Sequence, residues 1–162
     1  MSKLEEIIRF STEPKQVAKY FNLFANNLLK GESIERIEIE VSFSPKALIV
    51  TNFRIVECKS KSFGTEYDIL FYVFWDSLTG ARVLKGVISD DFEFKIGNSN
   101  VVWKCENYNS STSMDTIRFI LSEIDAKNNI NLPKSESKES NCETSPTTQE
   151  SSEVEVKLRP IS

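Results

Sequence analysis

The chain has 162 residues, 40% of them hydrophobic, and a formal net charge of −4, which fits one globular domain with appendages. The acidic balance argues against sequence-independent nucleic-acid binding, which needs a basic face, and no nucleic-acid partner is expected. The chain has no histidine, the commonest general base and metal ligand, so we expect a non-enzymatic protein without metal or cofactor.

The first thirty residues carry helical patterns. Leu4 to Phe10 predicts one or two helical turns, and Ser11 or Thr12 offers a side-chain oxygen that would cap a second helix. Apolar residues then recur at helical spacing, which predicts an amphipathic helix from Glu13 to Lys30 that Gly31 ends. The apolar stripe consists of Val17, Tyr20, Phe21, Phe24 and Leu28.

Seven later segments predict β-strands, because their apolar residues alternate or run continuously between turn signals. Within the first segment, Glu38 and Glu40 occupy a face that we expect to be solvated. Asp90-Asp91 is expected to form a solvated turn between the fifth and sixth strands. The predicted strands are Ser33–Phe43, Ala47–Thr51, Arg54–Lys59, Glu66–Trp75, Ala81–Ser89, Phe92–Ile96 and Val101–Tyr108.

The segment from Glu66 to Trp75 is apolar on both faces, whereas an antiparallel strand with one solvated face should alternate. We therefore expect its outer face to be covered as well. Our hypothesis is that the helix from Glu13 to Lys30 packs there. The rival hypothesis is a homodimer or partner interface on the same face.

A last helix is predicted from Ser113, as its cap, to Lys127. The remainder, residues 129–162, is rich in Ser, Glu and Thr, and we expect a disordered acidic tail. Its final stretch regains alternating apolar residues, a pattern typical of a linear motif that adds a strand to a partner or enters a groove. The alternative is an ordinary tail end. The motif comprises Val154, Val156, Leu158, Arg159, Pro160 and Ile161.

The termini and cysteines indicate a cytoplasmic location. Glu5-Glu6 is unlike the basic start of a secretory signal. No apolar run approaches the ~20 residues of a membrane-spanning helix. The three cysteines lack metal-ligand spacing, and Cys58 and Cys105 fall in predicted strands, where cysteine is usually a small buried hydrophobe. No disulfide framework is required, so a reducing compartment is expected.

Two stretches resemble a known superfold. Residues 47–56 read Ala-Leu-Ile-Val-Thr-Asn-Phe-Arg-Ile-Val, similar to a hairpin of GRAM, GLUE and bacterial PH-like domains, in which Thr-Asn, one variable residue and Arg link two apolar strands. Residues 74–83 resemble a later segment of those domains, where an aromatic and an acidic residue precede a turn and a valine-rich strand. Departures are Pro45-Lys46, where glycine is frequent, and the strongly apolar strand that ends at Trp75.

The resemblance covers about Glu32 to Lys127 and implies a PH-like α+β fold. That fold is a seven-stranded antiparallel bent sheet or barrel capped by a C-terminal helix, preceded here by an N-terminal amphipathic helix. The chain is therefore expected to divide into an N-terminal helical extension (1–31), a PH-like domain (32–128) and the tail (129–162).

The resemblance implies an adaptor that presents a sheet edge, or the groove beside its last helix, to an unidentified protein partner. A further possibility is that the chain is a subunit of a larger assembly. The alternative is a peripheral membrane module that recognises anionic, phosphoinositide-like lipid head groups. The contact residues would then be Lys46, Arg54, Lys59 and Lys61. Each lysine near an anionic membrane contributes about 1 kcal/mol, so attachment would be weak and salt-sensitive. For Arg54 we favour a structural role, bonding loop carbonyls or an acid such as Asp76.

Overall fold

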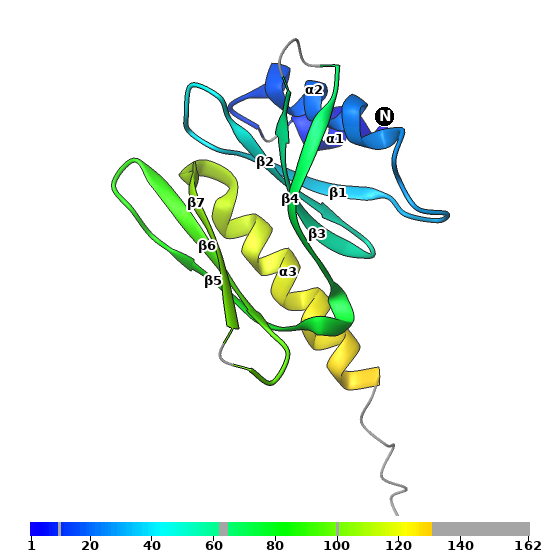
Figure 1. The fold of residues 1–162 in the computed structure, drawn as a ribbon, viewed down its shortest axis with the longest axis vertical. Coiled ribbons are helices and arrows are strands. Elements are labelled where there is room, and N and C mark those ends of the chain that lie inside the picture. Colours follow the sequence, from blue (N-terminus) through cyan, green and yellow to red (C-terminus); the bar gives the residue numbers. More distant parts are fainter. Residues whose placement is uncertain (10, 62–64, 100, 131–162) are drawn as a thin grey trace, which may run out of the picture. The chain divides into compact units, whose positions relative to one another are not determined.

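The computed structural model describes residues 1–9, 11–61, 65–99 and 101–130, which hold three α-helices and seven strands (Figure 1). All paired strands are antiparallel and form one sheet in the order β1-β2-β3-β4 and another in the order β5-β6-β7. The helices are α1 (Lys3–Ile8), α2 (Pro14–Ala25) and α3 (Ser110–Ile130). The strands are β1 (Ile34–Ile39), β2 (Lys46–Thr51), β3 (Arg54–Ser60), β4 (Tyr67–Phe74), β5 (Leu78–Leu84), β6 (Ser89–Ile96) and β7 (Val101–Asn109).

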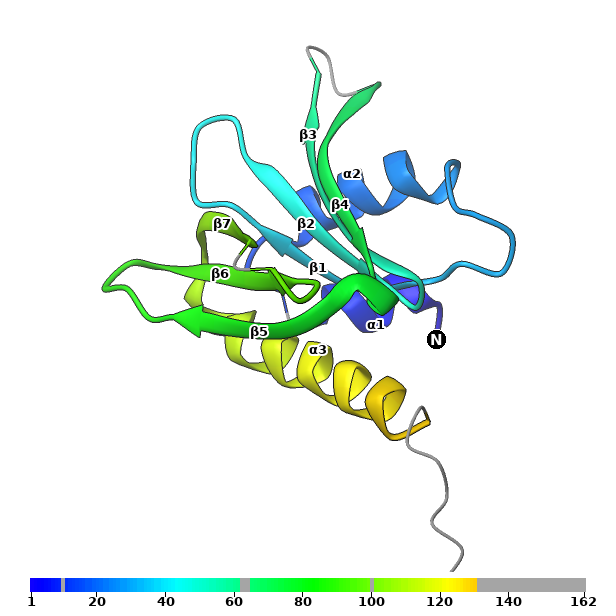
Figure 2. The same ribbon diagram turned by 60° about the horizontal axis from the view of Figure 1, so that its bottom comes forward.

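The two sheets pack against each other, and over the described residues they do not close into one barrel. The chain passes from the first sheet to the second through the 3₁₀ turn Trp75–Ser77, and an isolated bridge between Glu40 and Tyr108 joins the sheets at a second corner. α3 lies along the opening between them, with β5 on one side and β1 on the other (Figures 1 and 2). The predicted bent sheet with a closing helix and a preceding helix is therefore confirmed.

The larger hydrophobic core fills the space between the sheets. Alternation along each strand turns one set of side chains inward, and α3 adds three isoleucines at helical spacing. The rings of Phe94 and Trp103 lie 5.0 Å apart at its centre. Burying one side chain of this size contributes roughly 1.5–3 kcal/mol. The buried members are Leu48, Val50, Ile55, Val73, Trp75, Leu78, Phe92, Phe94, Trp103, Cys105, Tyr108, Ile117, Ile120 and Ile124.

A second core lies on the outer face of the first sheet, where α1 and α2 pack (Figure 2). The Tyr20 hydroxyl fixes α2 there, because it donates to the carbonyl of Pro45 and accepts from the backbone N–H of Ser60 at 3.0 Å. The buried members are Ile7, Val17, Tyr20, Phe24, Ile34, Ile37, Ile39, Ala47, Ile49, Val56 and Cys58.

β4 is left largely uncovered, so the predicted packing of the N-terminal helix along residues 66–75 is wrong. The helix is shorter than predicted, and its aromatic stripe is used on β1, β2 and β3. It reaches β4 at the first residue of the strand, where the rings of Phe24 and Tyr67 lie 5.8 Å apart. The rival hypothesis, a homodimer or partner interface on this face, stays a prediction.

Asp90, which the sequence analysis placed in a solvated turn, is fully buried. β5 ends at Leu84 and β6 begins at Ser89, so Asp90 lies inside a strand. Its carboxylate accepts hydrogen bonds from Lys85 Nζ at 2.6 Å and from the Ser113 hydroxyl. Such partners are what allows a charge to be buried. Ser113 lies inside α3 and serves this carboxylate, so its predicted role as the helix cap is also wrong.

The two cysteines in strands are fully buried free thiols, as predicted. Burial raises the pKa of the Cys58 thiol to about 12, which keeps it in the unreactive thiol form at neutral pH. Among the described helices, none combines the length and the apolar composition needed to cross a bilayer. The division of the chain at residues 31 and 128 stays a prediction, and most of the expected tail lies outside the described residues.

Candidate functional site

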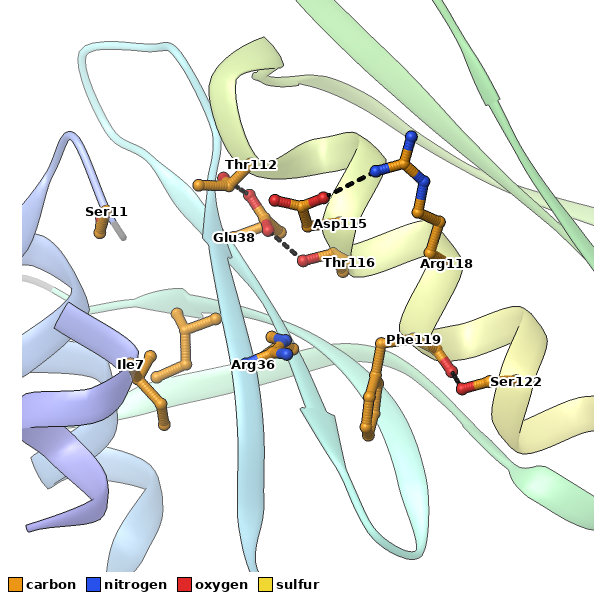
Figure 3. Close-up of a pocket in the computed structure, with 11 residues that line it drawn as sticks. Ile7, Ser11, Arg36, Glu38, Thr112, Asp115, Thr116, Arg118, Phe119 and Ser122 are labelled. Atoms are coloured by element: carbon orange, nitrogen blue, oxygen red, sulfur yellow. Dashed lines mark hydrogen bonds and ion pairs between the residues drawn. The ribbon is translucent and has the colours of Figure 1, made fainter. Parts of the chain in front are cut away.

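A groove of about 480 Å³ lies between β1 and α3, with the N-terminal segment at one end (Figure 3). Alternation along β1 puts Arg36 and Glu38 on one face of the strand. α3 presents Thr112, Thr116 and Phe119 to the same space, because spacings of four and three lie on one face of a helix. We call this site the β1–α3 groove.

Glu38 is buried at the wall of the groove, with 2% of its surface exposed, so the prediction that it lies on a solvated face is wrong. The Thr112 hydroxyl donates to Oε2 at 2.5 Å, and the Thr116 hydroxyl donates to Oε1 (Figure 3). Burial raises the pKa of the Glu38 carboxyl to about 7, against the opposing effects of the two hydroxyls and of Arg36. The carboxyl is therefore partly protonated at neutral pH.

A carboxyl with a pKa near 7 beside a groove has the proton affinity of a general acid or base. The geometry around Glu38 favours a positioning role instead. Each of its oxygens already accepts a threonine hydroxyl, and the residue has almost no exposed surface. Glu38 thus links β1 to the first turns of α3, the two elements that line the groove.

Arg36 is, with Arg118, one of two arginines that line the groove. Its guanidinium lies 5.3 Å from the centre of the Phe119 ring, a cation–π distance. Its Nη1 makes a long hydrogen bond of 3.5 Å to the carbonyl of Glu35. Its Nε is buried and has no hydrogen-bond partner among the described residues. Most buried donors in folded proteins are paired, so this N–H stands out as a donor for which the described residues supply no acceptor.

The rest of the lining is mixed. Ile7 and Phe119 give the groove apolar walls, and Ser11 adds a hydroxyl at its end (Figure 3). Asp115 and Arg118 form an ion pair of 3.0 Å on α3. Both side chains of that pair are highly exposed, so it contributes little to stability. An apolar surface with a few polar groups is the usual composition of a ligand site.

Arg54, one of the predicted anion contacts, is buried and paired within the fold. Its Nε and Nη2 donate to the two carboxylate oxygens of Glu32 at 2.8 and 3.0 Å. Glu32 also accepts from the backbone N–H of Leu29 and from the Thr51 hydroxyl, both at 2.8 Å. The acid beside Arg54 is thus Glu32 rather than Asp76, which is exposed.

The three predicted lysine contacts lie near one another, and two of them are paired with acids. Lys46 Nζ lies 2.9 Å from the carboxylate of Glu57, and Lys61 Nζ lies 3.0 Å from that of Asp68. Lys59 is exposed and sits opposite Lys46 in the β2–β3 ladder. None of the three lines the β1–α3 groove.

The predicted linear motif lies outside the described residues and stays a prediction. Its members are Val154, Val156, Leu158, Arg159, Pro160 and Ile161. Among the described residues, no three His, Cys, Asp or Glu side chains cluster so as to hold a metal ion.

No pattern in the sequence marked the groove residues as a site. The alternation of β1 correctly put Arg36 and Glu38 on one face, but nothing near them in sequence marks that face as covered. A usable signal was the pair Thr112 and Thr116, whose hydroxyls lie one helical turn apart at the start of α3. Hydroxyls at that spacing match the two oxygens of a single carboxylate.

Comparisons with known proteins agree with this fold. The sequence model of the family described as bacterial PH domain matches residues 5–120. A pleckstrin homology domain from Shewanella amazonensis SB2B superposes with a TM-score of 0.51 at 10% identity, covering 66% of this chain and 86% of that one. A DUF1696 family protein with a pleckstrin-homology domain from Shewanella loihica PV-4 gives 0.48 at 11% identity, covering 66% and 95%. The search of curated proteins found no match. The PH-like resemblance is thus confirmed, and the chain belongs to the bacterial PH domain family.

Proposed function

We propose that this chain is a non-enzymatic adaptor that holds a short segment of a protein partner in the β1–α3 groove. Its PH-like fold generally serves binding rather than catalysis, which supports the general role. The observation that carries the specific proposal is the buried, unpartnered Nε–H of Arg36 beside the ring of Phe119.

The chemistry of the groove limits what the segment is. A backbone carbonyl or a carboxylate would accept from Arg36, and a hydrogen bond to a charged group contributes about 1.5–3 kcal/mol. A neighbouring apolar side chain would cover Ile7 and Phe119. The acidic Glu38 and Asp115 nearby disfavour a densely anionic ligand. The preferred segment therefore carries one acceptor and one apolar anchor in close succession.

A displayed library of random short peptides, selected on the full chain, tests this proposal. We expect enriched peptides to lose at least tenfold in affinity, about 1.4 kcal/mol, on Arg36→Ala and on Phe119→Ala. Fluorescence polarisation with the enriched, labelled peptides measures the loss. Arg82→Ala is the matched control, because Arg82 pairs with Glu93 on the other sheet, outside the groove.

The proposal fails if the enriched peptides bind both groove variants as tightly as the wild type. It also fails if Arg82→Ala weakens binding as much as Arg36→Ala does. Unfolding curves of all three variants ensure that a loss of affinity is not a loss of fold.

Peripheral binding to an anionic lipid surface is the second candidate. Phe43, in the loop between β1 and β2, is completely exposed. A hollow beside it is also lined by Lys19, Lys59 and Lys61, which would attract anionic head groups. The same hollow contains the acidic Asp68, which pairs with Lys61 and reduces the positive charge. The partial neutralisation is why lipid binding ranks second.

Sedimentation with vesicles of phosphatidylserine and phosphatidylcholine tests the second candidate. If lipid binding is the function, the chain sediments with them at low salt, and Lys59→Glu with Lys61→Glu abolishes sedimentation. Vesicles of phosphatidylcholine alone are the control. A chain that stays in the supernatant at low salt excludes this candidate, and the groove variant Arg36→Ala should leave the result unchanged.

A further inference from the structure

The first sheet ends in an open edge. β4 is the last strand in the order β1-β2-β3-β4, and it has no second neighbouring strand among the described residues. Large apolar side chains along it are between 37% and 50% exposed. They are Ile69, Leu70, Phe71, Tyr72 and Phe74. Figure 2 shows β4 beside β3, on the side of β3 away from β2.

This edge carries few of the devices that keep sheet edges from pairing. Soluble proteins usually place lysine or proline on such a strand, or bend it sharply. β4 contains neither residue, and its one charge is Asp68 near the start. The irregularity opposite Glu57 and Cys58 leaves Leu70 without a partner on β3, so the regular, flat part of the edge is the apolar second half, up to Phe74.

We propose that this edge pairs with the same edge of a second copy, so that two four-stranded sheets join into one across a two-fold axis. The sequence of β4 suits itself, because its one charge lies at one end. With Tyr72 on the axis, Asp68 of each copy lies opposite Asp76 of the other, at the two ends of the paired segment. Both carboxylates are exposed and have a lysine of their own chain beside them, Lys61 for Asp68 and Lys127 for Asp76, so their repulsion is weak.

The pairing register is limited by the two faces of β4 and by the position of its apolar second half. Residues that lie opposite each other in an antiparallel pair share a face. Phe71 and Val73 point to the inner side, since Phe71 packs on Trp103 and Val73 belongs to the core. Among the registers that match the faces, we choose the one centred on the apolar second half, Leu70 to Phe74. It sets Phe71 of one copy opposite Val73 of the other and has the two Tyr72 residues facing each other on the axis.

The exposed area is near the lower limit for a specific interface. The five side chains leave roughly 40–50% of about 200 Å² each exposed, so pairing buries at most on the order of 800–1,000 Å² in total. Backbone hydrogen bonds along the edge add to this. The dimer is therefore expected to dissociate on dilution. β1 and β4 are opposite edges of the sheet, so the β1–α3 groove of each copy stays open.

A two-fold axis at Tyr72 makes a specific cross-linking prediction. In the full chain with Cys142→Ser, Tyr72→Cys should form an intermolecular disulfide on mild oxidation, because facing residues have Cα atoms at disulfide distance. Phe74→Cys on the same strand should not, because it faces Leu70 of the other copy. Val102→Cys, exposed on β7, is the control for random collision.

Sedimentation equilibrium over a dilution series gives an independent measurement. The wild type should approach twice its chain mass of 18.5 kDa at high concentration. Tyr72→Lys should stay monomeric with an unchanged far-UV spectrum, and Val102→Lys should behave as the wild type. A wild type that is monomeric at every concentration overturns the proposal, as does equal cross-linking at positions 72 and 74. A dimer that Tyr72→Lys leaves intact also overturns it.

Discussion

Glu32→Ala is expected to lower the free energy of unfolding by about 3–5 kcal/mol, the usual cost of removing one partner of a buried ion pair. The variant leaves the Arg54 guanidinium buried without its counter-charge. It also removes the acceptor of the Leu29 N–H and of the Thr51 hydroxyl, which are buried or partly buried. The loop after α2 and the turn between β2 and β3 would lose their common anchor.

Urea unfolding at neutral pH, followed by tryptophan fluorescence, measures the effect. Glu93→Ala is the matched control, because it breaks an Arg–Glu pair whose arginine is 69% exposed, and such pairs contribute about 0–1 kcal/mol. Glu32→Ala with Arg54→Met should recover part of the loss, since the uncompensated charge is gone. A loss below about 1 kcal/mol for Glu32→Ala would contradict the assigned role.

The same pair contributes to the loss of stability in acid. Burial of Glu32 acts to raise the pKa of its carboxyl, but the hydrogen bonds from Arg54, Leu29 and Thr51 outweigh it, and the pKa falls below its usual value. A carboxyl with a lowered pKa in the folded state stabilises the fold above its unfolded pKa, near 4.5. That contribution disappears as the pH falls through the folded value.

Local sequence patterns predicted a strand well where turn residues mark both of its ends. The segments Ala47–Thr51 and Val101–Tyr108 each differ from the observed strand by a single residue at one end. Gly97, which has a positive φ of 61°, begins the turn that the sequence predicted after β6. Glycine adopts that conformation without the steric cost that other residues meet.

Local patterns failed where the partner of a residue lies far away in sequence. Asp90 looked like a turn residue because its anchor, Ser113, is on another element. Glu38 looked solvated because the element that covers it, α3, is distant in sequence. The two threonines that bind its carboxyl are more than seventy residues away. Neither partner is visible in a window of ten residues, and an alternating pattern gives the face of a strand without saying what lies against it.

The position of α2 was mispredicted for a related reason. The hydrophobic patterns indicate that the apolar stripe of α2 and the apolar outer face of β4 should both be buried. They do not indicate that the two pack against each other. The helix packs on β1, β2 and β3, whose outer faces the sequence also makes apolar. The surplus apolar surface of β4 is thus a property of the folded chain that no single segment reveals.

Glu38→Gln is expected to stabilise the protein at pH 8 by up to about 3 kcal/mol and to have little effect at pH 4, since one pKa unit corresponds to about 1.4 kcal/mol. The pKa of the Glu38 carboxyl is about 7 in the folded state, against 4.5 as its ordinary value. A raised carboxyl pKa means that the folded state holds the proton more tightly, so stability declines as the pH rises from about 4.5 to 7. Above that range the buried charge imposes its full cost.

Glutamine removes that cost, because it has the shape of the protonated acid and keeps one acceptor and one donor for the hydroxyls of Thr112 and Thr116. Urea unfolding of both proteins at pH 4, 6 and 8 should give curves that separate progressively above pH 4.5. Glu106→Gln, on an exposed side chain of β7, should follow the wild type at every pH. An equal effect of Glu38→Gln at pH 4 and pH 8 would mean that the carboxyl titrates normally. The groove wall would then hold a permanent charge, and Arg36 would already have its counter-ion.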